Sequence, residues 1–312
     1  MFNLVQQRRW YFTVSSILMV ASILTMIYST ITLGTPLRLG IDFTSGSILE
    51  LEFERAVLPE EAREVVAEAG FSEATVQTVG DEQTVAIRAR SMEVEDKEAL
   101  RAALEARFGP ASELRFESVG PTIGRETTRA AVLAIAAASV VILFFIAIAF
   151  RHIPNAMRYG MCAVAKVLHD VVFLLGLVSL LGVVAHWEAD ALFLTAVITV
   201  IGFSVEDVIV VFDRIRENIG RRRGEDYETI VNRSLLETLH RSLATQLNAI
   251  FVMVAIILFG GATMREFIAV MLIGMVMGTY SSLFVAVPLL VSWERGELRR
   301  LFRRSSRADV TA

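Results

Sequence analysis

Long apolar runs alternate with polar stretches along the 312-residue chain. Windows of about 19 residues separate six such runs, each long enough to cross a hydrocarbon core of about 30 Å at about 1.5 Å per residue. The first run exceeds the roughly 7–15 apolar residues of a cleaved signal peptide, so we expect it to be retained. The pattern therefore predicts membrane-spanning helices over residues 11–33, 130–150, 160–184, 191–212, 242–260 and 266–293.

The polar interval over residues 34–128 has the pattern of a small α+β domain. Residues 58–70 and 95–108 are expected to form amphipathic helices, with Pro59 near the start of the first and Gly70 at its C-terminal cap. The resulting order, β-α-β-β-α-β, is that of a ferredoxin-like fold, which assigns no function by itself. Alternation predicts the strands over residues 47–53, 75–79, 83–88 and 113–117, with a hairpin turn at Gly80-Asp81.

The fold class expected from these two patterns is a polytopic α-helical membrane protein with six spans and an external α+β domain between the first two. Arginines flank the spans on one side, which places residues 1–10, 213–241 and 294–312 in the cytoplasm by the positive-inside rule. A hydrophobic content of 54% and a mean hydropathy of +0.55 agree with the membrane class. Both termini are therefore expected on the cytoplasmic side of the membrane.

The external interval is acidic, with 10 Lys and Arg against 19 Asp and Glu, which argues against binding to nucleic acid. The chain has one cysteine, Cys162, so disulfides and thiolate metal sites are not expected. There is no glycine-rich phosphate loop, no metal-spaced histidine cluster and no nucleophile elbow. We therefore expect no enzymatic activity, no catalytic residue, no metal and no cofactor.

Charged residues inside the third span, "AKVLHDVVF", need a reason, because a charge at mid-bilayer costs roughly 3 kcal/mol. Lys166 and Asp170 are one helical turn apart and can pair on one face. This pair either fastens the span to its neighbours or belongs to an ion path. His169 lies on a different flank, so we expect it to contact another partner.

The fourth span ends in "GFSVEDVIVVFDRIREN", with the adjacent acids Glu206 and Asp207 inside the apolar run. Two neighbouring carboxylates in a low dielectric cannot both stay ionised easily, so at least one should hold a proton near neutrality. We expect Asp207 to serve in a proton relay and Glu206 to contribute less. Ser204 allows close helix approach or admits water. Asp213, Arg214 and Arg216 close the run, and the two arginines are typical of interface anchors.

The fifth span begins "LHRSLATQLNAIF", with His240 and Arg241 at its edge and Gln246 and Asn248 further inside. Arg241 either leans toward Asp207 or reaches the headgroups. In the sixth span, small residues four apart predict close helix packing. These are Gly274 and Gly278, extended by Ser281 and Ser282.

Several stretches together resemble the SecF family, the six-span subunits of the bacterial SecD–SecF protein-export complex. "IGFSVEDVIVVFDRIREN" is similar to that family's fourth span over its whole length, and "LHDVVFLLG", "TLHRSLAT" and "LFGG" resemble its third and fifth spans. "LGIDFTSGSILEL" resembles its entry to the external domain, and "SVGPTIGRE" its re-entry. The motif residues are Gly40, Asp42, Phe43, Gly46, Gly120, Pro121 and Gly124.

The resemblance implies that proton flow through the membrane helices drives movements of the external domain and helps to pull a polypeptide outward. It implies the cytoplasmic (inner) membrane of a bacterium as the location, with the external domain in the periplasm. It also implies a SecD-type partner, the SecYEG channel, exported polypeptides and membrane lipid, with YajC and SecA as further candidates. The ion-coupling residues it implies, alongside Glu206, are Asp170, Asp207, Asp213, Arg214 and Arg241. A second tier holds Lys166, His169, His240, Gln246 and Asn248.

This chain departs from the family pattern at three places. Ser45 stands where glycine is common, Lys166 replaces a small apolar residue, and Thr245-Gln246-Leu247-Asn248 replaces a hydroxyl-rich run. The coupling ion is expected to be the proton, with Na⁺ as the alternative. Two other functions are open: an ion-coupled transporter of small molecules or lipids of the resistance-nodulation-division type, and a structural scaffold whose charges only lock helices.

Overall fold

A computed structural model describes residues 3–79, 82–151, 155–222 and 224–297, which divide into two compact units. The helical unit contains the described residues up to Arg38 and from Leu133 onward, and the α+β unit spans Leu39–Val132. Within the described residues, six helical stretches are long and apolar enough to cross a membrane. The six expected spans are thus all helical.

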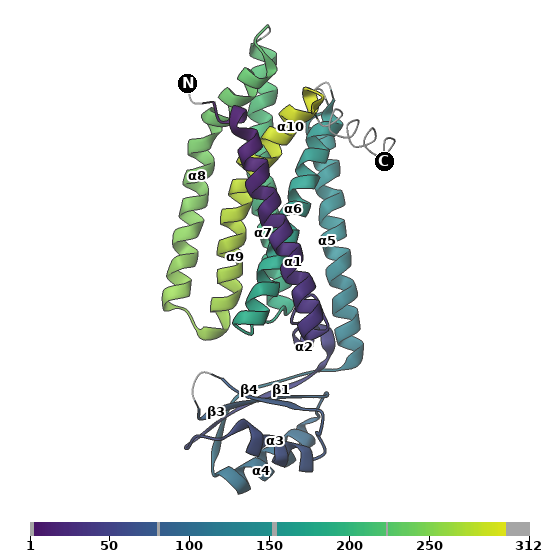
Figure 1. Ribbon diagram of the computed structural model, residues 1–312, viewed down its shortest axis with the longest axis vertical. Coiled ribbons are helices and arrows are strands. Elements are labelled where there is room, and N and C mark those ends of the chain that lie inside the picture. The colour runs from purple at the N-terminus through teal and green to yellow at the C-terminus, as the bar shows by residue number, and fades with distance from the viewer. Residues whose placement is uncertain (1–2, 80–81, 152–154, 223, 298–312) are drawn as a thin grey trace, which may run out of the picture. The chain divides into compact units, whose positions relative to one another are not determined.

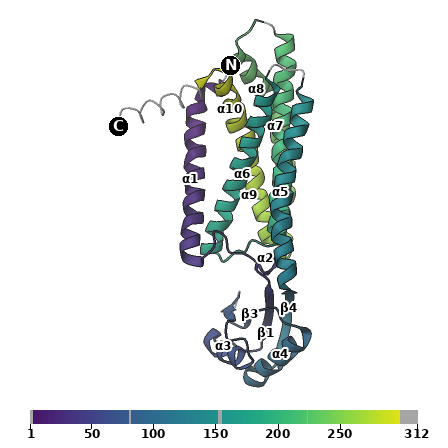
Figure 2. The same cartoon turned by 90° about the vertical axis from the view of Figure 1, so that its right-hand side faces the viewer.

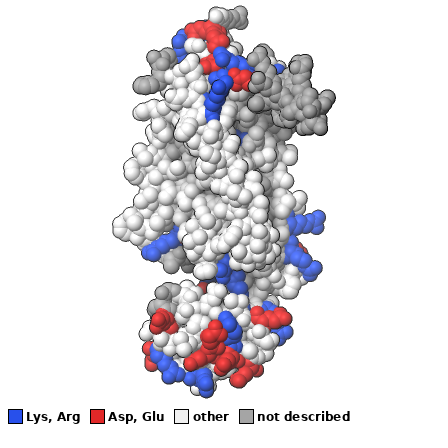
Figure 3. Space-filling view, viewed as in Figure 1, with Lys and Arg blue, Asp and Glu red and all other residues white. Residues whose placement is uncertain are grey.

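The helical unit is a bundle whose members run side by side (Figures 1 and 2). On the face shown in Figure 3, a wide band of this unit carries almost no Lys, Arg, Asp or Glu, and charges gather beyond it. Its elements are the 3₁₀ turn η1 (Val5–Gln7), α1 (Arg8–Leu33), α5 (Pro121–Ala149), α6 (Ala156–Val184), α7 (Ala191–Arg221), α8 (Tyr227–Phe259), α9 (Ala262–Ser281), the π-helical segment η2 (Ser282–Ala286) and α10 (Val287–Glu294).

Two helices extend well beyond the apolar runs that predicted them. The expected connection over 213–241 is largely helical, because α7 continues to Arg221 and α8 begins at Tyr227. Ion pairs at helical spacing support this extension, including Glu217 with Arg221 at 2.7 Å. Asp226 caps α8 by accepting a hydrogen bond from the Glu228 backbone at 3.1 Å. A hydropathy window detects only the apolar part of a helix, so it misses the polar turns by which α7 and α8 extend beyond the span.

The re-entry stretch "SVGPTIG" is also more helical than expected. The span was expected to begin at residue 130, but α5 begins directly at Pro121. Proline suits a first helical position, because its fixed φ matches the helix and the backbone N–H it lacks would have no partner there.

The sixth span changes its helical winding in the middle. The segment η2 is π-helical, and α10 begins immediately after it with Pro288 in its first turn. Proline has no backbone N–H for the carbonyl four residues earlier, and its ring clashes with that carbonyl. The π-helical turn shifts the hydrogen-bonding ladder at this point, and such turns are frequent at functional sites.

Small residues allow α7 and α9 to approach closely, as expected for the Gly274 and Gly278 face. A Cβ at Gly274 would lie 2.7 Å from a methyl of Val200, and one at Gly278 would lie 3.1 Å from Cβ of Ser204. A side chain at Gly274 would require Val200 to shift, and one at Gly278 would contact Ser204 more tightly than ordinary packing allows. The packing role of these two glycines is therefore confirmed.

The α+β unit has the expected order β-α-β-β-α-β, and its two longer helices lie on one face of the sheet (Figure 1). Strands pair antiparallel in the order β2-β3-β1-β4, with Leu49 opposite Ile87 on one side and Phe116 on the other. The expected turn at 80–81 lies outside the described residues. The elements are β1 (Gly46–Phe53), α3 (Pro59–Glu68), β2 (Thr75–Thr78), β3 (Thr84–Ala89), α4 (Val94–Phe108) and β4 (Ala111–Val119).

The two glycine motifs of this unit touch each other. Gly40 precedes a short helix, α2 (Ile41–Thr44), whose first turn holds Asp42. Ser45 and Gly46 follow with φ of 63° and 127°, and a Cβ at Gly46 would lie 2.7 Å from the carbonyl oxygen of Ala89. A Cβ at Gly124 of α5 would lie 3.3 Å from the Phe43 carbonyl oxygen. Both glycines are therefore required for close backbone packing.

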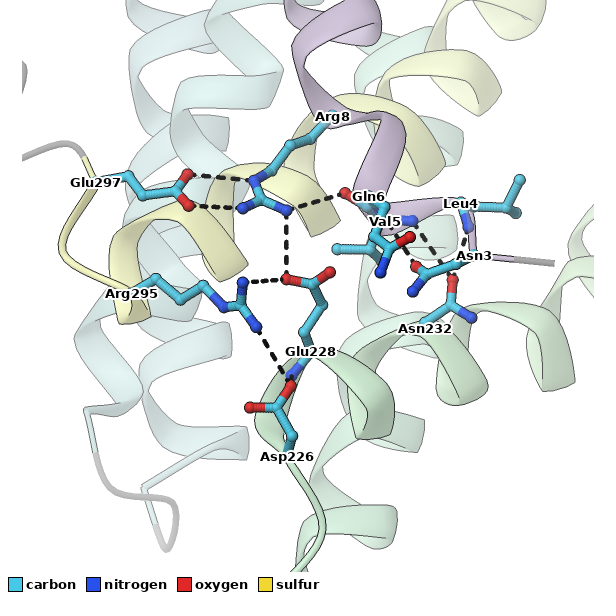
Figure 4. A network of polar contacts seen from close by, with 10 residues as sticks. All are labelled: Asn3, Leu4, Val5, Gln6, Arg8, Asp226, Glu228, Asn232, Arg295 and Glu297. Atoms are coloured by element: carbon cyan, nitrogen blue, oxygen red, sulfur yellow. Dashed lines mark hydrogen bonds and ion pairs between the residues drawn. The ribbon is translucent and has the colours of Figure 1, made fainter. Parts of the chain in front are cut away.

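A network of charged and amide groups joins α1, α8 and the segment after α10 (Figure 4). Glu228 is buried between two guanidinium groups, with Arg8 at 3.3 Å and Arg295 at 2.7 Å. Arg8 also binds both carboxylate oxygens of Glu297, and these hydrogen bonds hold the pKa of Glu297 below its ordinary value. The stability that this pair contributes is present above the ordinary glutamate pKa and is lost as the pH falls through the lowered one.

We predict that Glu228→Gln destabilises the helical unit by about 2–3 kcal/mol, because it removes the charged acceptor shared by two guanidinium groups. Glu225→Gln is the matched control, because Glu225 pairs with Arg222 and Arg233 at the surface, where a pair contributes less than about 1 kcal/mol. Thermal unfolding of the full chain in lipid nanodiscs measures both. Equal stability losses in the two variants would contradict this assignment.

Candidate functional site

The most deeply buried charges of the helical unit form a pair on α6. The Lys166 side chain has no solvent exposure and that of Asp170 has 1%, and Nζ lies 3.1 Å from Oδ2. This is the pair expected from their spacing of one helical turn. Two charges that are removed from water in this way must be neutralised locally.

Serines from two other elements complete the surroundings of this pair. Ser204 of α7 contacts the Lys166 ammonium through its hydroxyl, and its carbonyl oxygen accepts from Nζ at 2.7 Å. The same hydroxyl donates to Asp170 Oδ2 at 2.5 Å. Ser282 of η2 donates to the Ser204 carbonyl oxygen at 3.0 Å. The pair thereby joins α6, α7 and the sixth span.

His169 connects the pair to α1, which confirms the expectation of another partner. Its Nδ1 lies 3.1 Å from Asp170 Oδ1, and its Nε2 lies 2.6 Å from Ser15 Oγ. An ionised carboxylate only accepts, so Nδ1 donates to Asp170, and in the neutral ring Nε2 accepts from the serine hydroxyl. We call Ser15, Lys166, His169, Asp170, Ser204 and Ser282 the buried polar cluster.

Asp207 lies on α7, one turn beyond Ser204, and is 4% exposed. Its Oδ2 accepts a hydrogen bond of 2.9 Å from the Gln246 amide of α8. The other end of that amide, Oε1, is buried and has no hydrogen-bond partner among the described residues. Lys166 interacts electrostatically with Asp207 as well as with Asp170. The positive charge of Lys166 therefore stabilises the negative charges of both aspartates.

Three of the expected ion-coupling residues lie apart from Asp207. Asp213, Arg214 and Arg241 line a cavity of about 460 Å³ between α5, α7 and α8. The Arg241 side chain is exposed, and within the described part of the chain it makes no hydrogen bond or ion pair to Asp207. The partner of Asp207 is instead Gln246, from the run that departs from the family pattern.

Asp213 and Arg214 are paired with neighbours on α7 or on the adjacent helix α8. Arg214 binds Glu217 and Glu237, each at 2.5 Å, and Asp213 pairs with Arg216 at 2.7 Å. This geometry is that of helix-end anchors, in agreement with the interpretation of Arg214 and Arg216 from their position.

The remaining candidates face outward. His240 and Asn248 are exposed on α8, and Glu206 is exposed on α7. Glu206 continues a line of polar or small positions spaced three or four residues apart, which consists of Thr195, Thr199, Gly202 and Glu206. Thr199 is half-buried and the other three positions are exposed. We call this line the polar stripe of α7.

The serines of the buried polar cluster are what the sequence reasoning missed. Ser204 was expected to allow close helix approach or to admit water, and Ser282 to extend a packing face, whereas nothing was predicted for Ser15. The sequence does contain a pattern that could have predicted the position of Ser15. Ser15, Ser22 and Ser29 are spaced two helical turns apart and therefore lie on one face of the first span. All three are buried.

We predict that Asp170→Asn destabilises the chain by about 3–5 kcal/mol, because it leaves a buried ammonium without its carboxylate. Adding Lys166→Met should restore most of that loss, since the double variant buries no unpaired charge. The measurement is a double-mutant cycle of thermal unfolding in nanodiscs. Additive losses in the double variant would show that the two side chains do not act as a pair.

The chain matches two models of known protein families, which together cover most of its length. Residues 100–296 match the family described as protein export membrane protein SecD/SecF, C-terminal, and residues 30–57 match the SecD/SecF GG motif. The chain is 48% identical to the protein translocase subunit SecF of Thermobaculum terrenum, over 86% of this chain and 88% of that protein. It is 43% identical to the same subunit of Anaerolinea thermophila, over 98% and 99%.

A solved structure is similar as well. The crystal structure of SecDF, a translocon-associated membrane protein from Thermus thermophilus, matches with a TM-score of 0.79 and 31% identity. The match covers 94% of this chain but 39% of that longer chain. The chain belongs to the SecD/SecF family of protein-export membrane proteins, as a multi-pass member of the SecF type.

Proposed function

We propose that this chain is the subunit of a protein translocase that couples proton entry to the outward movement of polypeptides across the cytoplasmic membrane. The observation that carries the proposal is the charge balance around Asp207. Lys166 contributes one positive charge, and Asp170 and Asp207 contribute one negative charge each when ionised. With both carboxylates ionised this group has a net charge of −1, and one proton on Asp207 neutralises it.

The two aspartates are not equivalent as proton acceptors. Asp170 is held by Lys166, His169 and the Ser204 hydroxyl, all of which favour its ionised form. Asp207 has the Gln246 amide as its direct partner and shares Lys166 only at longer range. We therefore assign the exchangeable proton to Asp207, and we assign Asp170 the fixed counter-charge of Lys166.

Gln246 is suited to both states of Asp207. Its amide N–H donates to the ionised carboxylate, and its free carbonyl oxygen can accept from the carboxylic acid after rotation of the amide. Because Asp207 lies on α7 and Gln246 on α8, a change of protonation alters the contact between these helices. Movement between α7 and α8 is the step by which we connect proton uptake to mechanical work.

A SecD-type subunit completes the membrane half of the machine in this proposal. The family's longer members support this partner, since the chain also matches 38% of a Bacillus subtilis translocase subunit named SecDF, at 32% identity. The polar stripe of α7 would otherwise place the Glu206 carboxylate in hydrocarbon, at a cost of roughly 3 kcal/mol. We propose that the partner's helices cover this stripe.

The orientation in this proposal follows from the basic flanks of the spans. Both termini lie in the cytoplasm, and the ferredoxin-like α+β unit lies in the periplasm, where it meets the exported polypeptide. The role requires no catalytic residue and no cofactor other than the coupled ion. SecYEG, SecA and YajC are further partners within the proposal.

We predict that Asp207→Asn inserts and folds normally but loses proton-dependent export by at least tenfold, because the amide cannot exchange a proton. Asp213→Asn is the control of the same chemistry, and it should retain most of the activity because Asp213 pairs with Arg216 at the surface. Export of a reporter protein into inverted vesicles, with and without a proton gradient, measures both. Full gradient-dependent export by Asp207→Asn would overturn the mechanism.

We predict that Thr199→Trp reduces co-purification of the SecD-type subunit by about tenfold, which corresponds to about 1.4 kcal/mol, because the indole obstructs the polar stripe. Ile23→Trp, on an exposed position of α1, is the control and should leave co-purification unchanged. Quantitative pull-down from native membranes compares the two. Equal recovery of the partner with both variants would place the interface elsewhere.

A further inference from the structure

The Lys166 ammonium is held by oxygen atoms alone. They are Oδ2 of Asp170 at 3.1 Å, the carbonyl oxygen of Ser204 at 2.7 Å and the hydroxyl oxygen of Ser204. An ammonium has three N–H donors, and here three oxygens receive them. The side chain has no solvent exposure, so no water molecule competes for these positions from outside.

A carboxylate, a carbonyl and a hydroxyl are also the ligands that hard metal cations take in proteins. The oxygens converge from α6 and α7, and Ser282 of η2 adds a third element by donating to the same Ser204 carbonyl at 3.0 Å. The arrangement differs from an ordinary surface ion pair, in which one carboxylate meets one flexible ammonium. It is a small oxygen cage with a positive charge at its centre.

We propose that Lys166 is a tethered cation that occupies a site built for Na⁺, so that it restricts the coupled ion to the proton. A lysine supplies the positive charge that the cage requires but cannot leave it during a transport cycle. The exchangeable cation of this region is then the proton on Asp207. The part of this inference that concerns the coupled ion rests on the proposed function. Binding of Na⁺ at the position of the Lys166 ammonium can be tested without any transport measurement.

The test compares the full chain with its Lys166→Ala variant in lipid nanodiscs, by thermal unfolding in NaCl and in KCl at equal ionic strength. Removing the side chain leaves the Asp170 and Ser204 oxygens and the space that the ammonium filled. We expect a rise in Tm of about 2–4 °C in NaCl relative to KCl for Lys166→Ala, since a bound ion stabilises the folded state by mass action. The parent chain should show equal Tm in both salts.

Three further variants test which groups bind the ion. Adding Asp170→Asn to Lys166→Ala should abolish the sodium effect, because the carboxylate of the cage is lost. Lys166→Arg keeps a tethered positive charge and should stay insensitive to sodium. Lys166→Gln, which retains a donor toward the Ser204 carbonyl, repeats the test if the alanine variant does not fold.

A sodium-dependent Tm in the parent chain would overturn the inference outright, and so would equal Tm in both salts for the folded neutral variants. Neither result depends on export, so the proposed role of Asp207 is tested separately, by the export measurement. Conversely, a loss of export in Asp207→Asn together with sodium binding by Lys166→Ala would support both proposals independently.

Discussion

An ammonium without access to water must be neutralised where it lies, and this constraint on Lys166 determines the packing around it. Asp170 follows one turn later on the same helix, because that spacing brings the carboxylate beside the ammonium. Ser204 must then come within hydrogen-bonding distance, which brings α7 against α6. That approach requires a residue without a side chain opposite Ser204, and Gly278 of α9 fills this position. The ion pair, the serine and the glycine form one packed unit.

The same constraint separates two sets of charges that look alike in the sequence. Within the spans, Lys166, Asp170 and Asp207 interact in an almost fully buried environment, where a single proton changes the net charge of the group. At the helix ends, Asp213 and Arg214 are partly exposed and are satisfied by neighbours three residues away or on the next helix. Only the first set can link protonation to helix contacts at appreciable free energy, because solvent screens the second.

The sequence predicts the parts of this structure that depend on local spacing. Hydropathy located the six helices, alternation located the strands, and the spacing of Lys166 and Asp170 predicted their pair. Contacts between distant segments were harder to predict. Ser15 and Ser204 look like ordinary hydroxyls in apolar helices until the fold places them beside His169 and Asp170. Arg241 and Gln246 are five residues apart on one helix, and the helix rotation that selects the amide for Asp207 is fixed by packing alone.

The central claim is that Asp207 exchanges a proton while Asp170 stays ionised as the counter-charge of Lys166. Infrared difference spectroscopy of the full chain in nanodiscs, recorded between high and low pH, tests this most directly through the carboxylic acid band. We predict one such band, which is lost in Asp207→Asn and retained when Asp170 and Lys166 are replaced together by Asn and Met. A band that survives in Asp207→Asn and disappears with Asp170 would contradict the account.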